Sequence, residues 1–176
     1  MPGYWPHVAL YMGTSAQLDK LGIRTHKSGE KRSNKLVQPG QLVLEAMKDG
    51  VHIRSIDSPL KSDSLVLLRT NLAAEHLATA LARGLVHEGK PYDFDFNFLR
   101  SDRLVCTEVV YRSFQGVAKL QIPLTKRAGR QTLSGEDLIQ MAVRRQHFAP
   151  VAVYAPRINK HLISDASECD RILTHT

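Results

Sequence analysis

The stretch Asp102-Arg103-Leu104-Val105-Cys106-Thr107-Glu108-Val109-Val110-Tyr111 contains one of only two cysteines in the chain. If this stretch becomes helical at Cys106, the thiol lies at a helix N-terminus, where unpaired N–H groups and the positive end of the helix dipole stabilise a thiolate. Val109, Val110 and Ser113 would then share the face of the cysteine. We expect that face to be buried against a sheet, with the sulfur at the edge of the sheet.

The same stretch also has the alternation of a β-strand. Val105, Thr107 and Val109 are β-branched and would line one face of it. In that interpretation Cys106 is an inert core residue, as free cysteines often are. The local sequence therefore leaves both a helix and a strand open.

A nucleophilic cysteine needs a base, and His7 in Trp5-Pro6-His7-Val8-Ala9 could supply it. Pro6 has no N–H to donate to a sheet, so it suits the start of a strand over 8–12 with His7 at its head. Glu45 lies within a strand predicted over 41–47, where a buried carboxylate is costly unless it is paired. Glu45 therefore either faces outward from the sheet or orients a histidine.

Cys106, His7 and Glu45 would together form a thiolate–imidazolium pair that a third polar group orients, which is the arrangement of cysteine acyl transfer. The histidine would carry the proton, and the carboxylate would select its tautomer. Backbone N–H groups around the cysteine would bind the oxyanion. Our working hypothesis is a cysteine hydrolase with Cys106 as the nucleophile.

The rest of the chain alternates predicted strands and helices. Strands are expected over 8–12, 41–47, 51–56, 65–69 and 148–154, and helices over 15–23, over 71–87 and from Ser134 onward. The apolar strand 65–69 is expected to be central, whereas Pro150 predicts an edge strand or a strand start. Asn71 is the expected N-cap of the helix that follows.

Composition limits the classes of protein that the chain can belong to. A chain of 176 residues with 43% apolar residues suits one ordered domain. We expect that domain over residues 1–156, followed by a C-terminal tail of uncertain order over 157–176, where periodicity fades. Two cysteines cannot form a disulfide framework, and His161, Cys169 and His175 lack a recognised metal-ligand spacing. We therefore expect neither a metal nor another cofactor.

The formal net charge of +7 favours acidic partners. Much of the excess lies in 24–35, which we expect to be a mobile loop that could contact an anionic surface. No aromatic residues interleave with the basic groups, so a solvated loop is favoured over a nucleic-acid site. The chain has no apolar run of membrane-spanning length and no signal-peptide pattern, which makes a cytoplasmic location the default expectation.

Four blocks resemble successive blocks of the circularly permuted NlpC/P60 papain-like hydrolases, closest to the YiiX/YebB-like group. They are Trp-Pro-His-Val-Ala-Leu-Tyr-Met-Gly from Trp5, Leu-Val-Leu-Glu-Ala-Met from Leu42, Lys-Pro-Tyr-Asp-Phe-Asp-Phe from Lys90 and Leu-Val-Cys-Thr-Glu-Val-Val-Tyr from Leu104. In that group the histidine precedes the cysteine, as it does here. The resemblance covers about residues 4–114. The group usually has a further strand before the histidine block, so here that strand is either missing or replaced by another segment.

The resemblance implies an α+β, papain-like fold with a small antiparallel sheet packed against helices. It also implies hydrolysis of an amide or ester bond in a peptide, acyl or lipid-like substrate. Cys106 matches the nucleophile, His7 the base, Glu45 the third polar residue and Tyr92 a tyrosine that lines the substrate site. Glu108 belongs to the Cys-Thr-Glu motif with an open role, since it also places favourable charge on a helix first turn. The alternative is a catalytically inactive papain-like binding or regulatory module.

Overall fold

The structure is a computed structural model that describes residues 4–23 and 40–176, so the basic loop over 24–35 lies outside the described residues. Two compact units are distinguished. The first comprises Met1–Pro6, Pro59–Leu72 and Ser134–Thr176, and the second comprises His7–Ser58 and Ala73–Leu133. Within the described ranges, none of the helices combines the length and the apolar character that a membrane-spanning segment requires.

The second unit contains an antiparallel sheet in the order β1-β2-β3. Its strands are β1 (Ala9–Tyr11), β2 (Gln41–Met47) and β3 (Gly50–Ser55), which confirms the three strands expected there. Gly50 has a φ of +114° at the tight turn, and a Cβ at this position would lie 2.6 Å from the carbonyl oxygen of Lys90. The turn therefore requires glycine. It sets the register in which Glu45 pairs with Ala9 on one side and His52 on the other.

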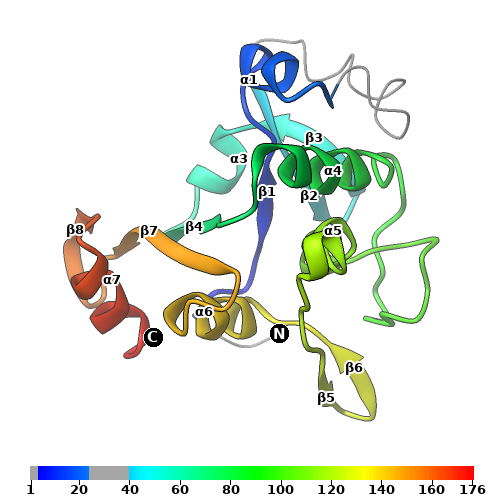
Figure 1. Ribbon diagram of the computed structural model, residues 1–176. Coiled ribbons are helices and arrows are strands. Elements are labelled where there is room, and N and C mark those ends of the chain that lie inside the picture. Colours follow the sequence, from blue (N-terminus) through cyan, green and yellow to red (C-terminus); the bar gives the residue numbers. More distant parts are fainter. Residues whose placement is uncertain (1–3, 24–39) are drawn as a thin grey trace. The chain divides into compact units, whose positions relative to one another are not determined.

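Helices of the second unit cover this sheet. The helical elements are α1 (Ser15–Lys20), α3 (Asp57–Leu60, whose first two residues belong to this unit), α4 (Ala74–Leu85), α5 (Cys106–Phe114) and the 3-10 helix η3 (Val117–Lys119). A hairpin of β5 (Thr125–Arg127) and β6 (Arg130–Thr132) follows. The helix expected at Cys106 is confirmed, and the strand alternative for this stretch is wrong. Figure 1 shows α4 and α5 side by side, and α5 also packs against β1 and β2.

The start of α4 differs from the expectation. Its N-cap is Ala73, whose side chain makes no capping hydrogen bond, so the prediction of Asn71 as N-cap is wrong. The reason is that the backbone of Asn71 continues the strand pairing of the first unit, where its N–H donates to the carbonyl of His147 at 3.3 Å. An N-cap directly precedes the first helical residue, so Asn71 lies too far from Ala74 to cap α4.

The first unit has its own antiparallel sheet, ordered β4-β7-β8, with two helices. The elements are β4 (Leu65–Thr70), α6 (Gly135–Val143), β7 (Phe148–Ala155), β8 (Asn159–Ile163) and α7 (Ala166–Leu173). Among the described strands β7 is central and β4 lies at an edge, so the expectation that strand 65–69 is central is wrong, and of the two alternatives for Pro150 only a position near the strand start holds. Pro150 is tolerated because β8 pairs only from Val153 onward, and because the β4–β7 register shifts opposite Pro150 at Leu67/Leu68.

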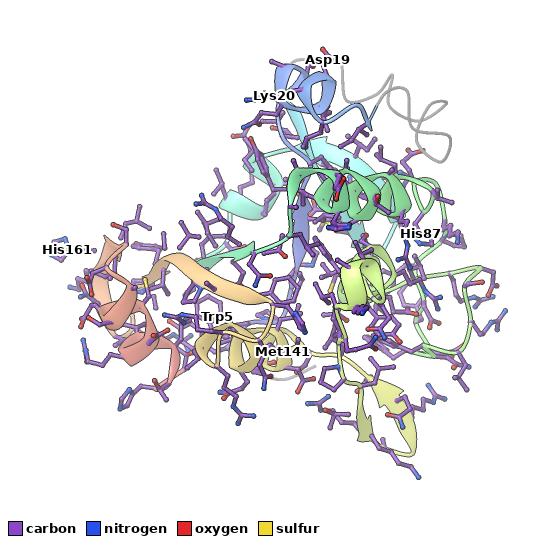
Figure 2. The ribbon with its side chains drawn as sticks, in the orientation of Figure 1. Trp5, Asp19, Lys20, His87, Met141 and His161 are labelled. Atoms are coloured by element: carbon purple, nitrogen blue, oxygen red, sulfur yellow. The ribbon has the colours of Figure 1, made fainter. Side chains whose placement is uncertain are left out.

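The expectation of a tail of uncertain order over 157–176 is wrong, because these residues form β8 and α7. Asp165 caps α7 by accepting the N–H of Glu168 at 2.9 Å. One face of α7 is buried in a cluster that also contains Trp5, and Figure 2 shows Trp5 beside α6. The buried members of the cluster are Trp5, Ile139, Val153, Ala155, Cys169, Ile172 and Leu173. Small antiparallel sheets with packed helices thus make an α+β fold.

Candidate active site

Cys106 is the first residue of α5 and is buried. The residue before it, Val105, is the N-cap, with an extended backbone and no side chain that could cap. The carboxylate of Glu108 takes over this function, because its Oε2 accepts the Val105 N–H at 3.0 Å. The N–H groups of Cys106 and Thr107 lie in the first turn, where a helix offers no internal acceptor.

Glu108 is completely buried, and its contacts extend beyond the helix start. Arg112, one turn later, donates to Glu108 Oε1 at 3.2 Å and to the carbonyls of Phe98 (3.1 Å) and Arg100. Burial raises the pKa of Glu108 to about 7, although the Val105 N–H and Arg112 both favour the charged form. These contacts link the start of α5 to the segment that precedes it, which is a structural role.

His7 lies immediately before β1 and contacts Glu45 of β2. Its Nε2 is 2.7 Å from Glu45 Oε2. The side chain of Glu45 is only 1% exposed, so the alternative in which it faces outward from the sheet is wrong. The antiparallel register explains the contact, since Ala9, two residues after His7, pairs directly with Glu45.

The protonation of this pair follows from its neighbours. Burial tends to raise the pKa of Glu45, but hydrogen bonds from His7 and Ser58 and the charge of Arg54 outweigh it and hold the pKa below its ordinary value. The pKa of His7 is raised to about 9, first by a hydrogen bond with the Cys106 side chain and then by the one with Glu45, against the effect of burial. His7 therefore interacts with both other candidate residues, and its imidazolium form is favoured at neutral pH.

Two further residues contact Glu45, and the sequence analysis did not identify either of them. The Ser58 hydroxyl donates to Glu45 Oε1, and Arg54 Nε lies 3.4 Å from the same oxygen. Arg54 could have been found from the strand register, because it lies two residues from His52, the partner of Glu45 in β3. Ser58 lies beyond the end of β3, and no local pattern points to it.

Tyr92 lies close to the candidate nucleophile. It pairs with Leu104 in a single parallel bridge, and its ring packs edge-on against those of Phe94 and Phe96, with centroids 5.0 and 6.3 Å away. Burial raises the pKa of Tyr92, and the charges of Cys106 and Asp93 raise it further. The structure thus brings Tyr92 within electrostatic reach of Cys106.

The segment between Tyr92 and Leu104 is folded around a buried carboxylate. Asp93 accepts the N–H groups of Asp95 at 3.1 Å and Asn97 at 2.6 Å. This turn buries Phe98 but leaves Phe94 66% exposed. Leu99 is 88% exposed on the same segment.

Two of the residues considered as metal ligands, His161 and Cys169, lie in β8 and α7 of the first unit. His161 points outward from β8 (Figure 2), whereas Cys169 is buried in α7 and lies 3.5 Å from the carbonyl of Ile163. Both cysteines are free thiols. In residues 4–23 and 40–176, no three or more His, Cys, Asp or Glu side chains are grouped so that they could hold a metal ion.

The chain is similar to a known protein family. A family model described as a permuted papain-like amidase enzyme, YaeF/YiiX, C92 family, matches residues 1–161. This range includes Cys106, His7, Glu45 and Tyr92. No curated protein and no solved structure matches the chain.

Proposed function

Because this chain belongs to the permuted papain-like amidases of the YaeF/YiiX, C92 family, we propose that it is a cysteine hydrolase that cleaves an amide or ester bond through Cys106, His7 and Glu45. Family membership confirms the YiiX-like resemblance and the papain-like α+β fold expected from the sequence. The family gives the general class of enzyme, whereas the roles of Cys106, His7 and Glu45 in the reaction are our proposal.

The observation that carries the proposal is the position of His7. It bonds Glu45 at 2.7 Å, and it also interacts with Cys106 at the start of α5. With a pKa of about 9, His7 is charged at neutral pH and carries the proton that the leaving group will need. A carboxylate that is almost completely buried stabilises this imidazolium and selects its orientation.

In the first half of the reaction, the Cys106 thiolate attacks the substrate carbonyl carbon and a carbon–sulfur bond forms. The negative charge moves to the carbonyl oxygen, which the first-turn N–H groups of α5 bind. The tetrahedral intermediate then collapses, and the bond to the leaving nitrogen or oxygen breaks. His7 gives its proton to that leaving group, so a neutral amine or alcohol departs and a thioester remains.

In the second half, neutral His7 takes a proton from a water molecule as that water attacks the thioester carbonyl. The carbon–sulfur bond breaks, the acid product leaves, and the Cys106 thiolate and His7 imidazolium are restored. Glu45 remains ionised throughout and offsets the charge on His7. Tyr92 lines the substrate side of the nucleophile in this proposal.

The exposed apolar side chains near the site favour a substrate with an apolar portion. Phe94 and Leu99 project from the segment that links Tyr92 to α5, with exposed fractions of 66% and 88%. Exposed aromatic and leucine side chains on a site loop suit contact with an acyl chain or an apolar peptide side chain. The proposed substrates therefore comprise acyl and lipid-like compounds as well as peptides.

The test is covalent labelling by p-nitrophenyl butyrate, an activated ester, followed by mass spectrometry. We expect one butyryl group on Cys106, and we expect Cys106→Ala and His7→Ala to lose it. Cys169→Ala is the matched control, because Cys169 is the other free, buried thiol and should not affect labelling. Labelling that survives in both Cys106→Ala and His7→Ala would overturn the proposal and favour an inactive papain-like binding module.

A further inference from the structure

Besides His7, the Glu45 carboxylate contacts two further side chains, and its two oxygens have different partners. Oε2 faces His7 at 2.7 Å. Oε1 accepts the Ser58 hydroxyl and lies 3.4 Å from Arg54 Nε. Since the carboxylate is fully shielded from water, these groups replace the hydration that an exposed carboxylate would have.

The position of Ser58 is set by the turn that starts α3. Ser55 Oγ accepts the N–H of Asp57 at 3.2 Å, and the Ser55 hydroxyl donates to the Asp57 carboxylate at 3.0 Å. This turn directs the chain back across the end of β3. Ser58 thereby comes against Glu45, and also against Met47 Sδ at 4.0 Å.

Arg54 is held in place from its other end. Its Nη2 bonds Asp49 Oδ1 at 2.6 Å in the β2–β3 turn. The buried Nε has no hydrogen-bond partner of good geometry in the described chain, and Glu45 Oε1 is its ion-pair partner. Asp49, Arg54 and Glu45 thus form a line of alternating charge that ends at His7.

The other ionisable side chain opposite Glu45 is turned away from it. His52 pairs with Glu45 in the strand register, but its Nε2 is 3.0 Å from the carbonyl oxygen of Asp49 and its Nδ1 is 3.9 Å from Glu88. Among the residues that the structure describes, the charged groups that pair with Glu45 are therefore His7 and Arg54.

We propose that Ser58 and Arg54 are positioning residues, which hold Glu45 ionised and aim its second oxygen at His7. This inference rests on the proposed function, because it assigns a support to the residue that orients the base. Ser58 supplies directional hydrogen bonding, and Arg54, held by Asp49, supplies charge. Without them, burial would favour a protonated Glu45, and a neutral acid stabilises an imidazolium far less than a carboxylate does.

The test compares Ser58→Thr with Ser58→Val. The two side chains have nearly the same shape, and only threonine keeps the hydroxyl, so a packing defect would affect both variants equally. The readout is the rate at which Cys106 reacts with iodoacetate, divided by its rate with neutral iodoacetamide, as a function of pH. An imidazolium attracts the anionic reagent, so this ratio reports the charge of His7 beside the thiol.

In the wild-type protein we expect the ratio to fall as pH rises through about 9. Ser58→Thr should keep that transition, whereas Ser58→Val should move it roughly one pH unit lower, a tenfold weaker hold on the proton. Arg54→Met should also lower the transition, and Arg54→Lys should largely restore it. Arg171→Met, which removes an exposed arginine paired with Glu168, is the control and should have no effect.

Identical profiles for Ser58→Thr and Ser58→Val, together with no shift in Arg54→Met, would overturn the inference while the proposed function stands. Failure of the proposed function has a different signature. In that case the wild-type protein itself would show no transition that depends on His7, whatever residue occupies position 58.

Discussion

Glu45 and Glu108 are both carboxylates that the fold buries, yet their pKa values move in opposite directions. Glu45 has a histidine, a hydroxyl and an arginine within reach, and its pKa falls below the ordinary value. Glu108 receives one backbone N–H and a 3.2 Å contact from Arg112, which do not outweigh burial, and its pKa rises to about 7. At the residue scale, the number and charge of neighbours decide which carboxylate can support an imidazolium.

The raised pKa of Glu108 predicts a pH dependence of stability. Glu108 binds its proton more tightly in the folded state than in the unfolded state, where its pKa is 4.5. The free energy of unfolding therefore falls as pH rises from 4.5 to about 7. Glu108→Gln removes this titration, while its amide oxygen can still accept the Val105 N–H. Between pH 5 and pH 7, the free energy of unfolding of the wild type should therefore fall relative to that of Glu108→Gln by on the order of 2 kcal/mol.

Urea unfolding followed by far-ultraviolet circular dichroism at several pH values measures this difference. Glu168→Gln provides a control, because Glu168 is only partly buried and its pKa lies below the ordinary value, so it has no loss of stability to remove in this window. A constant difference between wild type and Glu108→Gln over the whole range would contradict the assignment.

At the scale of elements, the site depends on how closely α4 approaches α5. Gly84 in α4 faces Ser113 in α5, and a Cβ at position 84 would lie 2.7 Å from Ser113 Oγ and 3.2 Å from Leu10 Cδ2. Ser113 in turn donates to the carbonyl of Val109 at 2.6 Å within α5. This close approach allows α5, which starts at Cys106, to pack against both α4 and the strands β1 and β2.

We predict that Gly84→Ala destabilises the protein by about 1–3 kcal/mol, through overpacking. In a helix interior, alanine is otherwise more favourable than glycine by roughly 1 kcal/mol. A loss of stability in Gly84→Ala would therefore indicate the steric conflict with Ser113. Ser113→Ala should partly relieve the clash, so the double variant should be less destabilised than the sum of the single variants. Chemical denaturation of all four proteins checks this, and additive effects would mean that the two positions do not touch.

The helix at Cys106 also shows where local pattern is insufficient. The β-branched residues around the cysteine allowed a strand, and the family motif alone did not exclude one. The helix is selected by contacts that the pattern does not contain, namely the Glu108 cap on Val105 and the seat against α4 and the sheet. Glu108, three residues after the N-cap Val105, is the local feature that favours a helix here, because a glutamate at this position can accept the N–H of the N-cap residue.

At the scale of the whole molecule, the ordered chain extends to its C-terminal residues. The face of α7 that carries Cys169, Ile172 and Leu173 is buried with Trp5, and the Trp5 indole N–H donates to Thr176 at 2.9 Å. The spacing of these apolar residues after an Asp165 N-cap is typical of an amphipathic helix. The segment is short and strongly polar elsewhere, so its apolar periodicity is weak in the sequence.

We predict that Ile172→Ala lowers the free energy of unfolding of this unit by about 2–5 kcal/mol, because it leaves a cavity in the cluster. Arg171→Ala, at the neighbouring position with a side chain that is 56% exposed, should change it by no more than about 0.5 kcal/mol. Trp5 is the single tryptophan, so its fluorescence during urea unfolding reports on this unit directly. Equal and small effects of both substitutions would restore the interpretation of 157–176 as a tail.

The sequence by itself determined the residues that can carry chemistry, most of the strands and helices, and the family. Those properties depend on residue type and local spacing, which a single chain displays directly. Cys106, His7, Glu45 and Tyr92 were all named from it, and their catalytic and binding roles stay predictions until they are tested.

Only the tertiary structure decided that Glu45 is buried between His7, Ser58 and Arg54, and that β7 rather than β4 is central in its sheet. These features arise from pairing between segments far apart in the chain. Burial and strand order minimise the free energy of the whole fold, and the same local pattern is compatible with several such arrangements. The partners that a buried charge acquires are therefore a property of the folded protein and not of the stretch that contains it.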